Sequence, residues 1–386
     1  MSSAPLSGLK VIELARILAG PWAGQVLADL GAEVIKIESP AGDDTRKWGP
    51  PFVANADGSS DAAYFHATNR GKVSVAVDLA TPQGQAQVRR LAHDADVLIE
   101  NFKVGSLAKY GLDYASLQQT HPGLIYCSIT GFGQDGPDAH RPGYDFIVQG
   151  LSGIMDLTGE PGGPPQKIGV AYADILTGLY AVIGIQAALA HRARTGRGQH
   201  IDMALFDVMV GTLANQAMNF LVSGVSPHRL GNAHPNIAPY EALPTRDSWI
   251  IVAVGNDPQF QRFCCVLGLE PEPRFQTNAQ RVACRETLSE MIAARTRRWD
   301  RESLLAKLEE VGVPAGPINS VADAFAHPQI RHRGMRLEIE RPGCGTVPGV
   351  RLPIRFSDAA LPETRAAPTL VPGSGAAGFT SHEVES

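Results

Sequence analysis

The sequence predicts an α/β protein with a doubly wound sheet domain and a smaller α+β domain. Over roughly the first 140 residues, short runs of β-forming residues alternate with segments of helical periodicity. Strands joined by helical crossovers form a largely parallel sheet that is covered on both faces. A stretch rich in Gly, Pro, Asn and His at residues 223–244 then separates a second set of elements. The 386 residues are 44% hydrophobic and 19% charged, a globular composition that excludes wholesale disorder.

The elements of the first part follow from their patterns in chain order. Five runs are rich in β-forming residues, and strands are expected over residues 10–14, 32–38, 72–78, 96–102 and 124–130. Apolar residues near helical spacing predict a helix over residues 20–30, with Gly31 as its C-terminal stop. A second helix is expected over residues 81–95.

The middle of the chain combines loops with apolar helices. Residues 39–60 form a long loop rich in Gly, Pro and Asp, and loops of this length are usually functional. Turn-forming residues return at 131–142. After them we expect a helix over residues 174–194, a strand over 199–205 and an apolar helix over 206–222.

The second set of elements predicts a small α+β domain over residues 223–330, including its linkers. It contains an expected strand over residues 249–255 and helices over 259–267, 285–295 and 301–311. Strand-like pieces follow from residue 331. The tail after Pro362 is rich in Pro and Gly, and its tip is expected to be poorly ordered.

Charge and hydropathy argue against several partners. The chain has 34 Lys and Arg against 39 Asp and Glu, so its formal net charge is −5, and no long basic block occurs. Nucleic acid and a membrane surface are therefore not expected as partners. The most apolar stretch, residues 179–190, is about half of a membrane span and is interrupted by Gly184 and Gln186, so no transmembrane helix is predicted. The start of the chain shows no secretory signal.

Cysteine and histidine spacing predicts neither disulfides nor a metal site. The five cysteines include no CxxC pair, which favours a reducing, cytoplasmic location. The eleven histidines are scattered without metal-ligand spacing. Walker A and GxSxG sequences are absent, so P-loop hydrolysis and serine hydrolase chemistry have no support.

One glycine motif is misleading. Residues 131–136 read GFGQDG, a literal GxGxxG after a predicted strand. Pro137 and the polar run to Arg141 do not open an apolar helix, and the strand is a late one. Dinucleotide binding is therefore not predicted, and a loop that approaches a ligand is the better interpretation.

Asp174 has two interpretations. It stands at the head of an apolar helix, where an aspartate is most often an N-cap. The helix dipole is expected to keep such a carboxylate ionised. An ionised and partly desolvated carboxylate is also what a nucleophile requires.

A series of motifs extends over roughly residues 6–365. In order they read LKVIELARILAGPWAGQVLADLGAEVIKIESP, GDDTRKWGPPF, ADVLIENFKVGSLAKYGL, IYCSITGFGQDGP, RPGYD, AYADILTGLYAVIGI, GNAHPNIAPY and GVPAGPIN. Together they resemble the family III CoA-transferases of the formyl-CoA transferase type, and within that family the succinyl-CoA–glutarate (dicarboxylate) transferases. The resemblance implies a Rossmann-like large domain built from both chain ends, residues 1–222 and 331–386. It also implies a homodimer of interlocked rings.

The resemblance also implies roles for residues. Asp174 occupies the position of the family's catalytic aspartate, which makes the N-cap the lesser interpretation. The implied contacts to CoA are Ala19, Leu79, Asn101, Phe102, Lys109, Arg141, Tyr144 and Asp145. The family often has a basic residue after the strand over 32–38, where this chain has Ser39 and Pro40, so that phosphate contact is in doubt.

The implied reaction needs no cofactor beyond CoA itself, which is substrate and product. Asp174 attacks the thioester of the donor, passes through an anhydride and an aspartyl–CoA thioester, and returns CoA to a second acid. Backbone N–H groups near Gly231 are candidates for binding the oxyanions. For a dicarboxylic acceptor, Arg16 and His234 are the expected partners of the second carboxylate. A buried arginine left unpaired costs roughly 1–3 kcal/mol, which predicts a preference of about tenfold or more for dicarboxylates.

Two other functions remain open. The 2-methylacyl-CoA racemases look similar and share the aspartate, but they have a histidine where this chain has Tyr144. Tyrosine has a reference pKa of about 10 and is a poor base near neutral pH, which favours transfer. The second is a non-catalytic acyl-CoA-binding protein, which would not need an aspartate at position 174.

Overall fold

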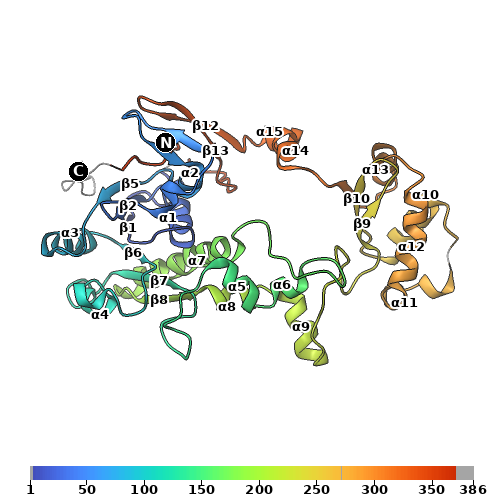
Figure 1. The fold of residues 1–386 in the computed structure, drawn as a ribbon, viewed down its shortest axis with the longest axis horizontal. Helices are drawn as coiled ribbons and strands as arrows, with labels where there is room; N and C mark the ends of the chain where they lie inside the picture. The colour runs from blue at the N-terminus through green and yellow to red at the C-terminus, as the bar shows by residue number, and fades with distance from the viewer. Residues whose placement is uncertain (1–2, 271, 371–386) are drawn as a thin grey trace. The chain divides into compact units, whose positions relative to one another are not determined.

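The computed structural model describes residues 3–270 and 272–370, which divide into two compact units. Among the described residues, the first unit contains 3–152, 169–212 and 328–370. The second contains residues 153–168, 213–270 and 272–327. Figure 1 shows the order of the elements along the chain.

A six-stranded parallel sheet forms the centre of the first unit. Its strands are β1 (Lys10–Glu13), β2 (Glu33–Glu38), β5 (Val73–Ala76), β6 (Val97–Glu100), β7 (Ile125–Thr130) and β8 (His200–Ala204). Their spatial order is β5-β2-β1-β6-β7-β8, and every pairing is parallel. Counted within the sheet this is 3-2-1-4-5-6, the order of the Rossmann fold, in which the order reverses between β1 and β6. The predicted doubly wound sheet is confirmed.

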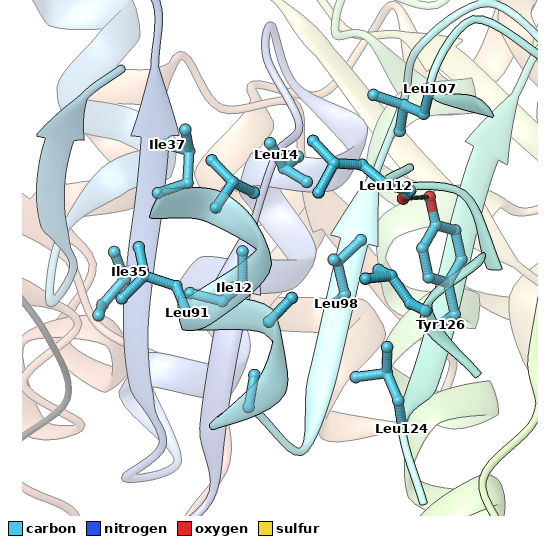
Figure 2. Close-up of a cluster of buried hydrophobic side chains, with 14 of the residues drawn as sticks. Ile12, Leu14, Ile35, Ile37, Leu91, Leu98, Leu107, Leu112, Leu124 and Tyr126 are labelled. Atoms are coloured by element: carbon cyan, nitrogen blue, oxygen red, sulfur yellow. Dashed lines mark hydrogen bonds between the residues drawn. The ribbon is translucent and has the colours of Figure 1, made fainter. Parts of the chain in front are cut away.

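Helices cover both faces of this sheet. Those of the first unit are α1 (Ala19–Asp29), α2 (Ala63–Asn69), α3 (Pro82–His93), α4 (Tyr114–Leu117), α5 (Asp145–Leu151), α7 (Tyr172–Thr195), α8 (Leu205–Gly211) and α15 (Pro328–His332). Leu91 of α3 packs with Ile12 and Ile35 of the sheet in one buried cluster (Figure 2). In the same cluster the Tyr126 hydroxyl donates to the Leu112 carbonyl at 2.9 Å. A buried polar group of the core is thus satisfied.

The other face is covered by α1 and α7, which pack against each other. A Cβ atom at Gly178 would lie 2.7 Å from the carbonyl oxygen of Ala19, so only glycine allows this close approach. Within the described residues, α7 is long enough and apolar enough to cross a membrane, with a mean hydropathy of 1.6. The bent pair formed by α8 and the helix over Ala214–Ser223 is a second candidate by the same criteria. Helix α7 packs against α1, β7 and β8, and 39% of its apolar stretch is buried.

Two hairpins and buried charges complete the first unit. The hairpins are β3 (Phe52–Ala54) with β4 (Ser60–Ala62) and β12 (Arg336–Arg341) with β13 (Gly345–Val350). The Asp61 carboxylate pairs with Arg46 at 3.0 Å and with Arg341 at 3.4 Å. Arg46 also forms a bidentate pair with Glu38. These buried pairs join the C-terminal hairpin to the sheet, and removing one partner would leave an uncompensated charge.

The second unit has its own core. A three-stranded antiparallel sheet in the order β11-β10-β9 comprises β9 (Tyr240–Pro244), β10 (Trp249–Ala253) and β11 (Ala315–Pro317). The helices are α6 (Ile154–Leu157), α9 (Ala214–Ser223), α10 (Asp257–Leu267), α11 (Asn278–Ala283), α12 (Arg285–Thr296), α13 (Arg301–Glu310) and α14 (Val321–Ala326). Phe263 and Ile292 lie at the centre of the core. The buried Arg281 donates to the Ala238 carbonyl and pairs with Asp257.

Several sequence-based boundaries were wrong. The predicted helix over 206–222 is broken into α8 and α9, which are bent by 72°, with Ala214 at φ 48°. The predicted loop over 39–60 contains the short helix η1 (Asp44–Lys47) and strand β3, and the predicted linker contains β9. The division of the chain also differs from the predicted one, because residues 153–168 and 213–222 belong to the second unit. The predicted disorder of the C-terminal tip falls at residues 371–386, outside the described residues.

Candidate active site

A cavity of about 710 Å³ lies at the carboxyl ends of the parallel strands. Segments that follow β1, β2, β5, β6 and β7 all contribute to its lining. The order of strands reverses between β1 and β6, and ligands of open α/β sheets bind at such a point. The location of the cavity therefore follows from the topology of the sheet.

Asp174 enters this cavity from the first turn of α7. The helix begins at Tyr172 after Ala171, so Asp174 is not its N-cap, and that interpretation was wrong. Ala171 has no side-chain acceptor for the first N–H groups of the helix. The Asp145 carboxylate caps the helix instead, because its Oδ1 accepts a hydrogen bond from the Ala173 N–H at 2.8 Å.

The Asp174 carboxyl is strongly perturbed. Burial, and then the negative charge of Asp145, raise its pKa to about 7. The expectation that the helix dipole would keep this group fully ionised is corrected, since desolvation and a like charge outweigh the dipole. Near neutral pH the group exists in both forms. A carboxyl with such a pKa in a cavity is a candidate catalytic group.

Two glycines bring α5 to the cavity. A Cβ atom at Gly131 would lie 2.4 Å from the Cα of Gly143, and a Cβ at Gly143 would lie 2.2 Å from the Cα of Gly131. Side chains are therefore impossible at this crossing, which places the segment before α5 against the end of β7. The GxGxxG sequence thus contributes to a contact between loops, and no helix follows directly after it.

The segment between β1 and α1 is held in a strained conformation. Ile17 has φ 72°, which is rare for a β-branched residue. Its N–H donates to the Asp43 carboxylate at 3.3 Å. Asn101 holds the preceding residue, accepting from the Arg16 N–H at 3.0 Å and donating to the Arg16 carbonyl at 2.7 Å. Strain that is fixed from several sides is common at functional sites.

Buried charges of β1 and β2 reach the cavity. Lys36, which lines it, forms ion pairs at 3.0 Å with both Glu13 and Asp43. Burial alone would lower the pKa of Lys36, but the carboxylates of Glu13, Asp43 and Glu38 outweigh burial and raise it. Sequence reasoning missed these residues. Their signal is a pair of charged positions, 36 and 38, in the buried part of β2, where positions 34, 35 and 37 are apolar.

Most of the predicted site residues meet in this cavity. Those that line it are Arg16, Ala19, Leu79, Asn101, Phe102, Arg141, Tyr144, Asp145 and Asp174. The expectation that Arg16 is buried was wrong. Its side chain is 66% exposed and pairs with Asp44 at 3.0 Å. Tyr144 is also exposed and directly precedes α5.

The basic residues differ in their relation to the cavity. Lys109 lies in the short helix η2 (Ala108–Tyr110), above the ring of Tyr110, and does not line the cavity. Lys103, which sequence reasoning missed, does line it and is exposed. Arg141 lines the cavity while pairing with Asp138 at 3.1 Å. Lys103 therefore adds a positive charge to the cavity, which Ser39 also lines.

The other two predicted residues belong to the second unit. The N–H of Gly231 donates to the Gly159 carbonyl at 3.1 Å, so this N–H is not free to bind an oxyanion. His234 accepts from the Asn236 N–H through Nδ1 at 3.1 Å and packs against Tyr240. These contacts fix the His234 segment within its own unit.

Titratable groups in the rest of the described chain were compared with the arrangement that a metal site requires. Within residues 3–270 and 272–370, no group of three or more His, Cys, Asp or Glu side chains is arranged to hold a metal ion. Glu100 at the end of β6 is buried, which raises its pKa to about 7. It accepts from the Phe102 N–H at 2.8 Å and so shapes the cavity wall rather than a second site.

Comparison with known proteins gives matches over nearly the whole chain. The sequence profile of CoA-transferase family III matches residues 6–373. The chain is 58% identical over 371 residues to a succinate–glutarate CoA-transferase of Agrobacterium fabrum, covering 95% of this chain and 93% of that protein. It is 42% identical over 373 residues to the succinyl-CoA:glutarate CoA-transferase of Homo sapiens, covering 95% and 83%. A crystal structure of a CAIB/BAIF family protein from Brucella suis matches with TM-score 0.86 and 60% identity, covering 96% of this chain and 97% of that one.

Proposed function

The chain belongs to CoA-transferase family III, and on this premise we propose that it moves CoA from succinyl-CoA to a second dicarboxylic acid, with Asp174 as the nucleophile. The observation that carries the proposal is the Asp174 carboxyl, which faces the cavity from the first turn of α7. A pKa of about 7 makes it more basic than an ordinary carboxylate while leaving a large fraction ionised. Both properties favour nucleophilic attack.

The first half of the reaction loads CoA onto the protein. Asp174 attacks the thioester carbonyl of the donor, the C–S bond breaks, and an aspartyl–acyl anhydride and CoA thiolate form. The thiolate then attacks the Asp174 carbonyl of the anhydride. The first acid leaves as its carboxylate, and CoA remains attached to Asp174 as a thioester.

The second half repeats these steps in reverse. The carboxylate of the acceptor attacks the aspartyl thioester, which forms a new anhydride and releases the thiolate. The thiolate attacks the acceptor's carbonyl, giving the new acyl-CoA and the free Asp174 carboxylate. Both intermediates react readily with water, so a cavity that limits water around them is needed.

The substrate class is supported by relatives and by the charges of the cavity. The two enzymes described above are named for succinate or succinyl-CoA and glutarate. Arg16, Lys103 and Arg141 line the cavity and supply positive charge for phosphates and carboxylates. We assign the second carboxylate of the acceptor to Arg16, in exchange for its present partner Asp44.

We also propose that the working form is the interlocked homodimer. Support comes from α5, α7 and α8, which pack together in the first unit and leave an apolar outer surface. Its exposed side chains include Phe146, Ile147, Leu151, Tyr180, Ile183 and Val210. Exposed apolar surface of this kind marks an interaction site, and a second copy of the chain is the occupant that we propose.

The cytoplasm remains the proposed location.

The test is an exchange assay with succinyl-CoA and a panel of free acids, followed by chromatography of the CoA esters. The proposal predicts glutaryl-CoA formation matched by succinate release, with Asp174→Asn inactive. Exchange of the α-proton of a 2-methylacyl-CoA in heavy water, without transfer, would instead indicate the racemase. Binding of CoA esters without either reaction would indicate a non-catalytic protein.

A further inference from the structure

We infer that Asp145 is a positioning residue for Asp174: its carboxylate closes the open N-terminus of α7 and, together with Gln149, fixes how the Asp174 side chain enters the cavity. This inference rests on the proposed function, since it gives Asp145 a part in the reaction assigned to Asp174. It replaces the contact to CoA that the family resemblance implies for Asp145.

The geometry engages both oxygens of the Asp145 carboxylate inside the protein. Oδ1 accepts from the Ala173 N–H, and Oδ2 accepts from Gln149 Nε2, each at 2.8 Å. Gln149 is completely buried, so its side chain is a fixed support. Ala173 directly precedes Asp174 in the helix. The cap therefore holds the backbone of the residue directly before the nucleophile.

A carboxylate at this place is a poor contact for CoA. The phosphates of CoA are anionic, and a carboxylate would repel them. A carboxylate that caps a helix is instead stabilised by its N–H groups and by the helix dipole. The residue before α7, Ala171, provides no side-chain cap, so Asp145 supplies the acceptor for an N–H group of the first turn.

The charge of Asp145 has a second effect on the reaction. It disfavours the anionic form of Asp174 and so makes that carboxylate more basic. Tyr64 of α2 also interacts electrostatically with Asp174, and its pKa is raised to about 12 by burial and then by Asp174 and Asp145. Tyr64 is neutral throughout the working range of pH. After burial, which is the larger cause, the charge of Asp145 thus raises the pKa of the nucleophile further.

The decisive variant is Asp145→Asn, which keeps the shape and removes the charge. The amide oxygen of the new Asn can still accept from the Ala173 N–H. Its NH₂ can donate to Gln149 if the Gln149 carboxamide flips, so that Oε1 faces residue 145. The acid limb of kcat/KM is expected to move to lower pH by about one unit. The KM for acyl-CoA should stay within about twofold, since no contact to CoA is lost.

Asp145→Ala removes the cap as well as the charge. Here kcat is expected to fall by about tenfold or more, because the nucleophile is no longer held in position, again with little change in KM. Asp57→Asn is the matched control. Asp57 also accepts a backbone N–H, that of Ser59 at 2.9 Å, but it does not line the cavity. Its pH profile should equal that of the unchanged protein.

A measurement independent of turnover keeps this inference separate from the proposed function. In protein labelled with ¹³C at aspartate carboxyl carbons, the resonance missing from Asp174→Asn identifies Asp174. Its titration midpoint should lie near pH 7 and drop in Asp145→Asn. An unchanged midpoint, or a rise of about tenfold in the KM for acyl-CoA with kcat and pH profile intact, would overturn the positioning role. Absence of CoA transfer in the unchanged protein would overturn the proposed function alone.

Discussion

The side chain of Asn101 and the backbone of Arg16 exchange two hydrogen bonds. The Arg16 N–H donates to Asn101 Oδ1 at 3.0 Å, and Asn101 Nδ2 donates to the Arg16 carbonyl at 2.7 Å. Asn101 follows β6, and Arg16 precedes the strained residue Ile17. One carboxamide thus joins the two loops at the point where the strand order of the sheet reverses.

Asn101→Ala is expected to loosen this junction. Loss of both bonds costs roughly 1–2 kcal/mol, which corresponds to a drop in kcat/KM of about five- to thirtyfold if the loop must hold this shape for the reaction. Steady-state kinetics measure the effect. Asn55→Ala is the matched control, because Asn55 donates to Ser59 and Asp61 at the β3–β4 hairpin and does not line the cavity. Equal losses in the two variants would contradict the role of the junction.

Activity is expected to rise with pH through about 7. Asp174 reacts as its anion, and its raised pKa of about 7 means that protonation removes the nucleophile below that value. The profile of kcat/KM should fall about tenfold per pH unit on the acid side and reach a plateau above pH 8. Ordinary carboxylates, with a pKa near 4, would give a flat profile from about pH 5 upward. A flat profile would therefore contradict the perturbed nucleophile.

Arg16 is expected to give a modest preference for dicarboxylic acids. Because its side chain is exposed and paired with Asp44, its contribution is that of a surface ion pair, roughly 0.5–1 kcal/mol. The predicted preference for succinate or glutarate over butyrate is therefore about two- to fivefold from this residue, below the tenfold expected for a buried arginine.

Two variants test the Arg16 contact, with competition between acceptor acids as the measurement. Arg16→Ala should reduce kcat/KM for dicarboxylates selectively. Asp44→Asn should lower the KM for dicarboxylates, since the acceptor no longer competes with Asp44. If Arg16→Ala lowers kcat/KM equally for all acids, Arg16 does not bind the second carboxylate.

The protein is expected to be a dimer at every measurable concentration. Interlocked rings cannot separate without opening a chain, so dissociation would be coupled to unfolding. Sedimentation across a wide concentration range, with circular dichroism on the same samples, measures both properties. A folded monomer at low concentration would contradict the interlocked arrangement.

Local patterns were sufficient to predict most of the sheet. Runs such as residues 32–38 and 124–130 became β2 and β7 because their apolar residues suit a strand buried on both faces. The break between α8 and α9 could not be predicted in the same way. The apolar pattern continues across it, but α8 ends at Gly211 and the next helix begins at Ala214, where the backbone has a positive φ.

Some residues of the cavity lining could be predicted from the sequence, but the contacts between them could not. The motifs led to Asp174 and to eight other residues of the cavity lining. The cap from Asp145 to Ala173 joins residues far apart in the chain, and the contact of Gly131 with Gly143 depends on a close approach of two loops. Neither leaves a periodic signal. Lys36 was missed because a buried lysine is rare unless carboxylates pair with it, and these come from other segments.

The central claim is that Asp174 carries CoA during the reaction, and mass spectrometry after chemical trapping tests it most directly. The protein is incubated with succinyl-CoA, treated with borohydride and digested, with Asp174→Asn treated in parallel. The account predicts that the peptide containing residue 174 carries a primary alcohol in place of the carboxyl, and that the variant shows neither this change nor transfer. A reduced side chain at another residue, or substantial transfer by Asp174→Asn, would contradict it.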